Sequence, residues 1–154
     1  MATQMQLCTF TVDDLFFGID VMRVQEIIQL QHMTRVPLAP KLIRGLINLR
    51  GQIVMAVDLR ERLELPPREG SEPPTNVVVQ GTDAAVSLLV DSVGDVIEVS
   101  EESFEPPPAT MLPRYRQVVD AVCKLPRGLL LLLDPERAAS SADAISAGRR
   151  GYPR

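Results

Sequence analysis

Two hairpin-like segments, one in each half of the chain, restrict its fold more than any other feature of the sequence. In the first, the corner Arg50-Gly51 separates two apolar runs, the second of which ends at Asp58. In the other half, the step Arg127-Gly128 opens an apolar run that ends at Asp134. Short apolar, β-branched runs joined at a glycine corner are typical of β-hairpins. One chain with the same corner twice predicts an internally duplicated, all-β fold.

The two halves also align outside these hairpins. When Phe17-Gly18-Ile19 is laid on Val86-Ser87-Leu88, Glu26 falls on Asp95 without any gap, and we call this the ungapped alignment. The hairpins align only at a larger offset. The offset that aligns the two Arg-Gly steps is one position larger than the offset that aligns Asp58 with Asp134, and a β-bulge would absorb this difference. The alignment predicts two similar small barrels or curled sheets related by a pseudo-two-fold axis. Two unrelated β-rich halves can also align to this degree, so that alternative stays open.

Chain length limits how independent the two halves can be. At 154 residues, the chain forms one compact domain or two very small ones. A half of about 60–70 residues buries only about 60% of its unfolded surface, so the halves should share a large apolar contact. Within a folded region over residues 6–137, we expect a first barrel over 6–64 and a second over 75–134, with exchange of strands left open. We expect a turn-rich linker over 65–74 and a flexible tail over 138–154.

Composition argues against several classes of function. The net charge is −4, aromatic residues make up 4% of the chain, and tryptophan is absent. A nucleic-acid binder needs a basic face and aromatic platforms for bases, so a nucleic-acid-binding β-barrel is only a remote alternative. No apolar run approaches the about 20 residues of a membrane span, and the first residues lack the pattern of a signal peptide. We therefore expect a cytoplasmic protein without direct membrane insertion.

No arrangement of residues indicates catalysis. His32 is the only histidine, and the two cysteines, Cys8 and Cys123, lie in strand-like runs far apart in the sequence. These residues fit neither the spacing of a metal site nor a nucleophile with its base. We expect no enzymatic activity, no metal site and no cofactor.

Two charged residues stand out because their neighbours are apolar. Glu26 interrupts the run of Val24, Ile27 and Ile28, and Arg50 occupies the first hairpin corner. A guanidinium presents a planar fork that matches a carboxylate. We predict that Glu26 and Arg50 form an ion pair. Because an exposed ion pair adds little to stability, the role of this pair would be to hold a docking surface in shape. Two unpaired surface charges are the alternative.

Several motifs together resemble one known family. Residues 17–21 (Phe-Gly-Ile-Asp-Val) and 24–27 (Val-Gln-Glu-Ile) resemble the opening of the CheW-like chemotaxis coupling proteins. Residues 45–51 (Gly-Leu-Ile-Asn-Leu-Arg-Gly) resemble the core motif of that family, and residues 57–60, 89–93 and 131–134 resemble three of its later motifs. The resemblance implies two pseudo-symmetric, SH3-like, five-stranded β-barrels packed together, with short helical turns. Ser87 departs from the family, which commonly has glycine at this point.

The resemblance also implies a function and a set of binding residues. It implies a non-enzymatic adaptor that links the cytoplasmic tips of methyl-accepting chemoreceptors to the regulatory domain of the histidine kinase CheA. Contacts with other CheW-like proteins in arrays stay open, and so does service in a related pathway such as twitching motility or surface sensing. Carried over by position, receptor binding falls on Val24, Glu26, Arg50 and Val96, and kinase binding on Met33 and Gly45.

Overall fold

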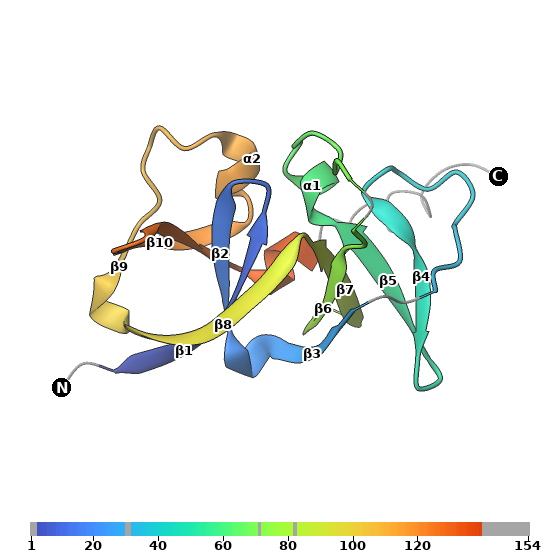
Figure 1. The fold of residues 1–154 in the computed structure, drawn as a ribbon, viewed down its shortest axis with the longest axis horizontal. Helices are drawn as coiled ribbons and strands as arrows, with labels where there is room; N and C mark the ends of the chain where they lie inside the picture. Colours follow the sequence, from blue (N-terminus) through green and yellow to red (C-terminus); the bar gives the residue numbers. More distant parts are fainter. Residues whose placement is uncertain (1–2, 30–31, 71, 82, 140–154) are drawn as a thin grey trace.

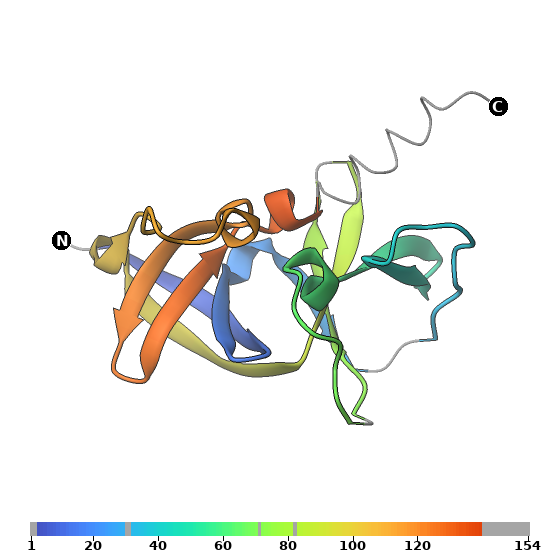
Figure 2. The same cartoon turned by 90° about the horizontal axis from the view of Figure 1, so that it is seen from above.

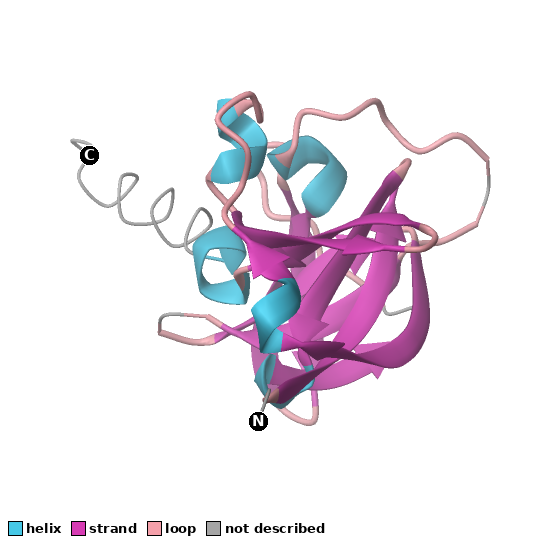
Figure 3. Cartoon of the chain, turned by 90° about the vertical axis from the view of Figure 1, so that its left-hand side faces the viewer, coloured by secondary structure: helices cyan, strands magenta, loops and turns pink. Residues whose placement is uncertain are grey.

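The structure, a computed structural model, describes residues 3–29, 32–70, 72–81 and 83–139. Strands form the body of the molecule, and short helical turns lie at its periphery (Figure 3). The strands are β1 (Gln4–Val12), β2 (Leu15–Asp20), β3 (Val24–Ile28), β4 (Ile43–Leu49), β5 (Gln52–Asp58), β6 (Thr75–Gln80), β7 (Ala85–Val90), β8 (Ser92–Ser100), β9 (Phe104–Glu105), β10 (Val119–Leu125) and β11 (Gly128–Leu133). The labelled helical turns are η1 (Val21–Arg23), α1 (Leu59–Arg62), η2 (Glu101–Ser103) and α2 (Pro113–Arg116). The predicted all-β fold with short helical turns is confirmed.

The strands form two sheets that lie side by side along the long axis of the molecule (Figures 1 and 2). The first sheet has the order β8-β1-β2-β11-β10-β9, and the second has the order β3-β6-β7-β5-β4. Each sheet contains one parallel pair, β2 with β11 and β7 with β5, and the other pairs are antiparallel. The predicted five strands are present in the second sheet, whereas the first carries the short β9 as a sixth.

Both sheets have the same connectivity, and each combines strands from both halves of the chain. The hairpin β1–β2 shares its sheet with β8 to β11, and the hairpin β6–β7 shares its sheet with β3 to β5. Neither of the predicted ranges, 6–64 and 75–134, therefore corresponds to one sheet, and the exchange of strands that the sequence left open is present. The exchange of strands has a physical reason. A two-stranded hairpin is marginal alone, and strands from the other half complete its sheet while tying the halves together.

The duplication is also visible in the irregularities of the second hairpin of each half. The register of β4 against β5 shifts between Ile43 and Gly45. The register of β10 against β11 shifts between Val119 and Ala121, which are the same two places when Asp58 is aligned with Asp134. Because the halves share a bulge as well as a strand order, chance alignment of two β-rich sequences does not explain the duplication.

The two Arg-Gly steps, however, do not occupy equivalent places. In the first hairpin, Arg50-Gly51 are the two residues between the paired strand ends. In the second hairpin, Pro126-Arg127 hold these two places, and Gly128 is already the first residue of β11. The prediction of equivalent Arg-Gly corners is therefore wrong by one residue. The offset that aligns Asp58 with Asp134 aligns the whole of the two hairpins. The larger offset for the Arg-Gly steps, and the bulge that would explain it, are therefore not needed.

There are three cores: one is shared by the two sheets, and one lies in the interior of each sheet. Most central strands therefore have both faces buried. Successive side chains point to opposite faces of a strand, so Val77 and Val79 of β6 enter the core shared by the two sheets while Val78 enters the interior of its own sheet. Every strand of the second sheet contributes a side chain to that interior, as expected of a sheet that curls round on itself. These side chains are Ile28, Ile47, Val54, Val78 and Ala85. In the shared core, the rings of Phe10 and Phe17 are stacked with their centroids 5.5 Å apart.

The residues that follow β11 belong to the shared core. Residues 135–139 form a helical turn that lies between the sheets, drawn in red in Figure 2. The Asp134 carboxylate starts this turn by accepting hydrogen bonds from the backbone N–H groups of Glu136 and Arg137. Ala138 and Ala139 are completely buried, so the ordered region extends at least two residues beyond the predicted boundary at 137. The rest of the predicted tail, 140–154, lies outside the described residues.

Candidate docking surfaces

The predicted partners Glu26 and Arg50 are in contact. Arg50 Nη1 donates to Glu26 Oε2 over 2.7 Å, and Nη2 donates to Oε1 over 2.6 Å, so the pair is bidentate. The Arg50 side chain is 79% exposed and that of Glu26 is 28% exposed. The hydrogen bonds and the charge of Glu26 raise the pKa of Arg50 above its ordinary value. The geometry fixes the direction of an exposed cation, which is a property of a recognition surface.

The backbone at Arg50 is also unusual. Arg50 has φ 52° and Gly51 has φ 84°, so both turn residues are left-handed, as a type I′ hairpin turn requires. Glycine adopts this conformation freely, whereas arginine is strained in it. The turn joins β4 to β5 at one end of the sheet order, and Glu26 lies on β3 at the other end. The ion pair therefore closes the curled second sheet, and the strained turn is held against its far edge.

The other two predicted receptor residues differ in burial and location. Val24 lies on β3, two residues before Glu26, and its half-buried side chain packs against the shared core. Val96 lies on β8 in the first sheet and is 56% exposed. In the ungapped alignment of the halves, Val96 corresponds to Ile27 of β3, which is 41% exposed. The four predicted receptor residues are thus divided between the two sheets, and Ile27 is an exposed neighbour that sequence reasoning did not include.

The predicted kinase residues Met33 and Gly45 lie next to each other. A Cβ atom added to Gly45 would lie 2.8 Å from the Thr34 carbonyl oxygen and 3.2 Å from Met33 Cβ. Thr34 forms two backbone hydrogen bonds with Leu46, each 2.9 Å long, that hold the segment 33–41 against β4. Gly45 is buried, so its role is to let this segment approach β4, whereas Met33 is the residue of the two that a partner can touch.

Met33 lines a hollow of about 580 Å³ beside the segment 33–41. Its apolar lining includes Met33, Val36 and Ile43. Its charged lining consists of Arg35, Lys41 and Arg44 with one carboxylate, Glu61. Arg44 donates to Asp58 over 3.0 Å, so its charge is partly balanced. A basic hollow on a chain with net charge −4 favours a partner with acidic groups.

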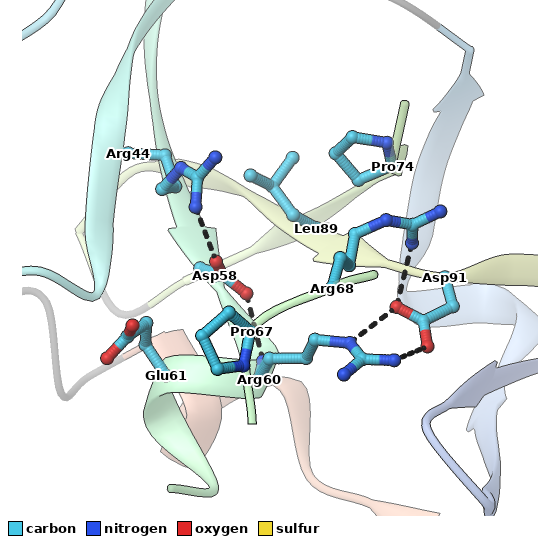
Figure 4. Close-up of a pocket in the computed structure, with 9 residues that line it drawn as sticks. All are labelled: Arg44, Asp58, Arg60, Glu61, Pro67, Arg68, Pro74, Leu89 and Asp91. Atoms are coloured by element: carbon cyan, nitrogen blue, oxygen red, sulfur yellow. Dashed lines mark hydrogen bonds and ion pairs between the residues drawn. The ribbon is translucent and has the colours of Figure 1, made fainter. Parts of the chain in front are cut away.

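A cluster around Asp91 joins four parts of the chain, and sequence reasoning did not predict it (Figure 4). Arg60 of α1 donates to both Asp91 oxygens, over 3.0 and 2.6 Å, and Arg68 of the linker donates over 2.8 Å. The backbone N–H of Asp13, in the β1–β2 turn, donates over 2.7 Å. Burial alone would raise the pKa of Asp91, but these hydrogen bonds and the charges of Arg60 and Arg68 outweigh it and lower the pKa below its usual value.

This cluster borders a small cavity but has the character of a structural joint. The cavity measures about 210 Å³, and its three arginines face three carboxylates, among which Asp91 is the hub. Arg60 and Asp91 belong to two motifs that carried the family resemblance, but they are far apart in the sequence, and no periodicity predicts their pairing. Only the fold brings α1, the linker and the β7–β8 junction together.

The described residues offer little else for chemistry or membrane crossing. No group of three or more His, Cys, Asp or Glu within them has an arrangement that could hold a metal ion. Among the same residues, no helix is long and apolar enough to cross a lipid bilayer.

Comparisons with known proteins agree with this picture. The chain matches the CheW-like domain family over residues 6–143. It is 31% identical to the chemotaxis protein CheW of Klebsiella aerogenes, covering 87% of this chain and 81% of that relative. It is 29% identical to the chemotaxis protein CheW of Treponema pallidum, covering 91% and 85%. The crystal structure of the scaffolding protein TtCheW from Thermoanaerobacter tengcongensis matches with a TM-score of 0.80 at 26% identity, covering 88% and 92%. This chain belongs to the CheW-like domain family.

Proposed function

We propose that this chain couples methyl-accepting chemoreceptors to the histidine kinase CheA in bacterial chemotaxis. The observation that carries the proposal is the family match, which spans residues 6–143 and so includes both sheets. The chain is a non-enzymatic scaffold of chemotaxis signalling, as its family is. We infer that it acts in the cytoplasm, where receptor tips and the kinase recruit it to membrane-associated arrays.

We assign receptor binding to the surface of Val24, Glu26, Arg50 and Val96. Two features support this assignment. The Arg50 guanidinium is fixed by two short hydrogen bonds although its side chain is 79% exposed. Ile27 and Val96 expose apolar side chains at equivalent places of the two exchanged strands, which suits the apolar face of a helical receptor tip.

We assign kinase binding to the surface that Met33 and Gly45 form with the segment 33–41. Gly45→Asp would put a Cβ atom 2.8 Å from the Thr34 carbonyl oxygen and would push this segment away from β4. We expect the variant to lose CheA in a pull-down. It should still fold around the core shared by the two sheets and around the interior of the first sheet. Glu26→Ala serves as the control, since it lies on the receptor surface and should retain CheA.

Co-purification tests the proposed function directly. The full chain is mixed with the CheA regulatory domain and a receptor signalling fragment, each tagged in turn, and the captured proteins are quantified. We expect the chain to bind each partner alone and both together. Failure to capture either partner at micromolar concentration would overturn the proposed function.

A further inference from the structure

Leu38, at the tip of the segment 33–41, is more exposed than any other large apolar residue that the structure describes. Its exposed fraction is 93%. A single exposed leucine is common on protein surfaces and by itself indicates nothing. Leu38 differs because its backbone is also strained: φ is 63°, in the left-handed region that favours glycine.

The strain arises from a tight turn over residues 36–39, which contains Pro37 and is followed by Pro40. The backbone N–H of Ala39 donates to the Val36 carbonyl over 3.3 Å, which places Pro37 and Leu38 at the two central positions of the turn. Proline suits the first of these positions, and the positive φ at the second calls for glycine or asparagine. Leucine costs backbone strain here, and its side chain gains no burial within the described structure. Its side chain therefore contributes nothing visible to the fold, and strained residues of this kind cluster at binding sites.

The surroundings of Leu38 indicate what kind of partner fits. Val36 and Ala39, on either side of the turn, line the hollow beside Met33. Arg35 and Lys41 flank the turn, are exposed, and have no ion pair or hydrogen bond with the residues that the structure describes. An apolar tip between two such cations complements an apolar pocket bordered by carboxylates.

We propose that Leu38 is the apolar anchor, and Arg35 and Lys41 the flanking charges, of a docking surface for a partner with an apolar, acid-rimmed pocket. The inference rests on the proposed function and assigns that pocket to the CheA regulatory domain. It deepens the assignment of Met33 and Gly45, because Gly45 then positions the segment that presents Leu38. A few buried anchors carry most of the affinity of such interfaces, so Leu38 should contribute more to affinity than the residues that line the hollow.

Leu38→Gly tests the anchor without endangering the fold. Glycine suits φ 63° better than leucine does, so the melting temperature should stay the same or rise. We expect the dissociation constant for the CheA regulatory domain, measured by isothermal titration calorimetry, to rise at least tenfold. The matched control is Leu129→Gly, which removes a leucine that is 44% exposed on β11 of the first sheet and should leave this dissociation constant unchanged.

The flanking charges are tested by reversal. In Arg35→Glu/Lys41→Glu, we expect at least tenfold weaker binding in low salt and a smaller dependence of affinity on salt concentration. Arg116→Glu, an exposed cation of α2 in the other half of the chain, is the control and should bind like the wild type.

The outcomes separate this inference from the proposed function. Wild-type affinity in Leu38→Gly, or an unchanged salt dependence in the double reversal, would overturn the anchor and its charges while the adaptor function stands. If Leu38→Gly loses affinity only together with melting temperature, the inference is also overturned, because the residue is then structural. Absence of wild-type binding to the kinase domain would overturn the proposed function and this inference with it.

Discussion

The two hairpin corners occupy equivalent places in a duplicated fold, yet their arginines have different environments. Arg50, in the second sheet, lies in the turn itself with a left-handed backbone and donates two hydrogen bonds to Glu26 across the curled sheet. Arg127, in the first sheet, is displaced by one residue, and its guanidinium carbon lies 4.4 Å from the centroid of the Phe16 ring. The first arrangement strains the turn and presents an exposed cation, whereas the second covers an aromatic ring. Duplication has kept the scaffold, and the surfaces have diverged.

The interiors of the two sheets diverge in a matched way. In the ungapped alignment of the halves, Leu7 and Gly18 of the first sheet correspond to Asn76 and Ser87 of the second. A Cβ atom on Gly18 would lie 3.1 Å from Leu7 Cδ1, so the large leucine requires a glycine beside it. In the second sheet, Ser87 Oγ and Asn76 Oδ1 are 2.9 Å apart in a hydrogen bond, and both residues are buried. The buried hydroxyl group of Ser87 is satisfied because Asn76 Oδ1 accepts its hydrogen bond.

Asp91→Asn should have the largest effect on stability, because it removes the carboxylate at the centre of the charged cluster. The other half of the chain has no charge at the equivalent position. In the same alignment, Asp91 corresponds to Met22, which is 85% exposed and uncharged. The variant removes the carboxylate that Arg60 and Arg68 share, and the Arg60 side chain, which is only 14% exposed, keeps only the more distant Asp13, 3.7 Å away. We expect a loss of about 2–3 kcal/mol in the free energy of unfolding, measured by urea denaturation. Met22→Asn, a substitution at the equivalent position of the other half, should alter it little.

The same residue predicts how stability depends on pH. The pKa of Asp91 is lower in the folded state than in the unfolded chain, so acid favours unfolding. Its contribution is complete above the unfolded pKa of about 3.9 and is lost as pH falls through the lower folded value. Urea midpoints of wild type and Asp91→Asn should therefore converge below about pH 4. A constant difference down to the lowest pH at which the protein stays folded would contradict the assigned pKa direction.

Exchanging the interior pair of one sheet for that of the other tests the matched divergence. Asn76→Leu alone leaves the Ser87 hydroxyl unsatisfied, also removes the hydrogen bond from Asn76 Nδ2 to the Gln29 carbonyl oxygen, and should cost about 2 kcal/mol in the free energy of unfolding. Asn76→Leu/Ser87→Gly copies the pair Leu7 and Gly18, and we expect it to recover the part of that loss that comes from Ser87 in thermal or urea denaturation. A double variant that is no more stable than Asn76→Leu would show that the two positions are not coupled.

Arg50→Gly separates recognition from folding at the first corner. Glycine relieves the left-handed backbone, so the melting temperature should stay the same or rise, although the ion pair with Glu26 is lost. Affinity for a receptor signalling fragment should fall at least tenfold in calorimetry, if the surface acts as proposed. A variant with unchanged receptor affinity would remove Arg50 from that surface.

Arg127→Ala should have the smallest effect. It removes an exposed cation–π contact with Phe16, which is worth about 0.5–1 kcal/mol. Receptor and kinase affinity should be unchanged, since neither proposed surface includes this corner. A loss of receptor affinity equal to that of Arg50→Gly would mean that the two corners have not diverged in function.

Local pattern was sufficient to predict the hairpins, the duplication and the contact between Glu26 and Arg50. Alternating or continuous apolar runs mark strands, and an acid and an arginine that interrupt such runs have few other partners. The sequence left an exchange of strands open but could not identify β3 and β8 as the exchanged strands, because pairing between distant strands depends on the tertiary fold. The hub at Asp91 was missed for the same reason. The sequence places the second corner one residue too late, because the same dipeptide, Arg-Gly, occurs near both corners. Only the pairing of Leu125 with Gly128 shows that the turn residues are Pro126 and Arg127.

The central claim is that one duplicated scaffold carries two separate docking surfaces, one for receptors and one for the kinase. The most direct measurement is capture of both partners by the same variants: wild type, Arg50→Gly and Leu38→Gly, each with a receptor signalling fragment and the CheA regulatory domain. We predict that the wild type captures both together, that Arg50→Gly keeps only the kinase domain, and that Leu38→Gly keeps only the receptor fragment. Loss of both partners in either variant, with its melting temperature preserved, would contradict the claim.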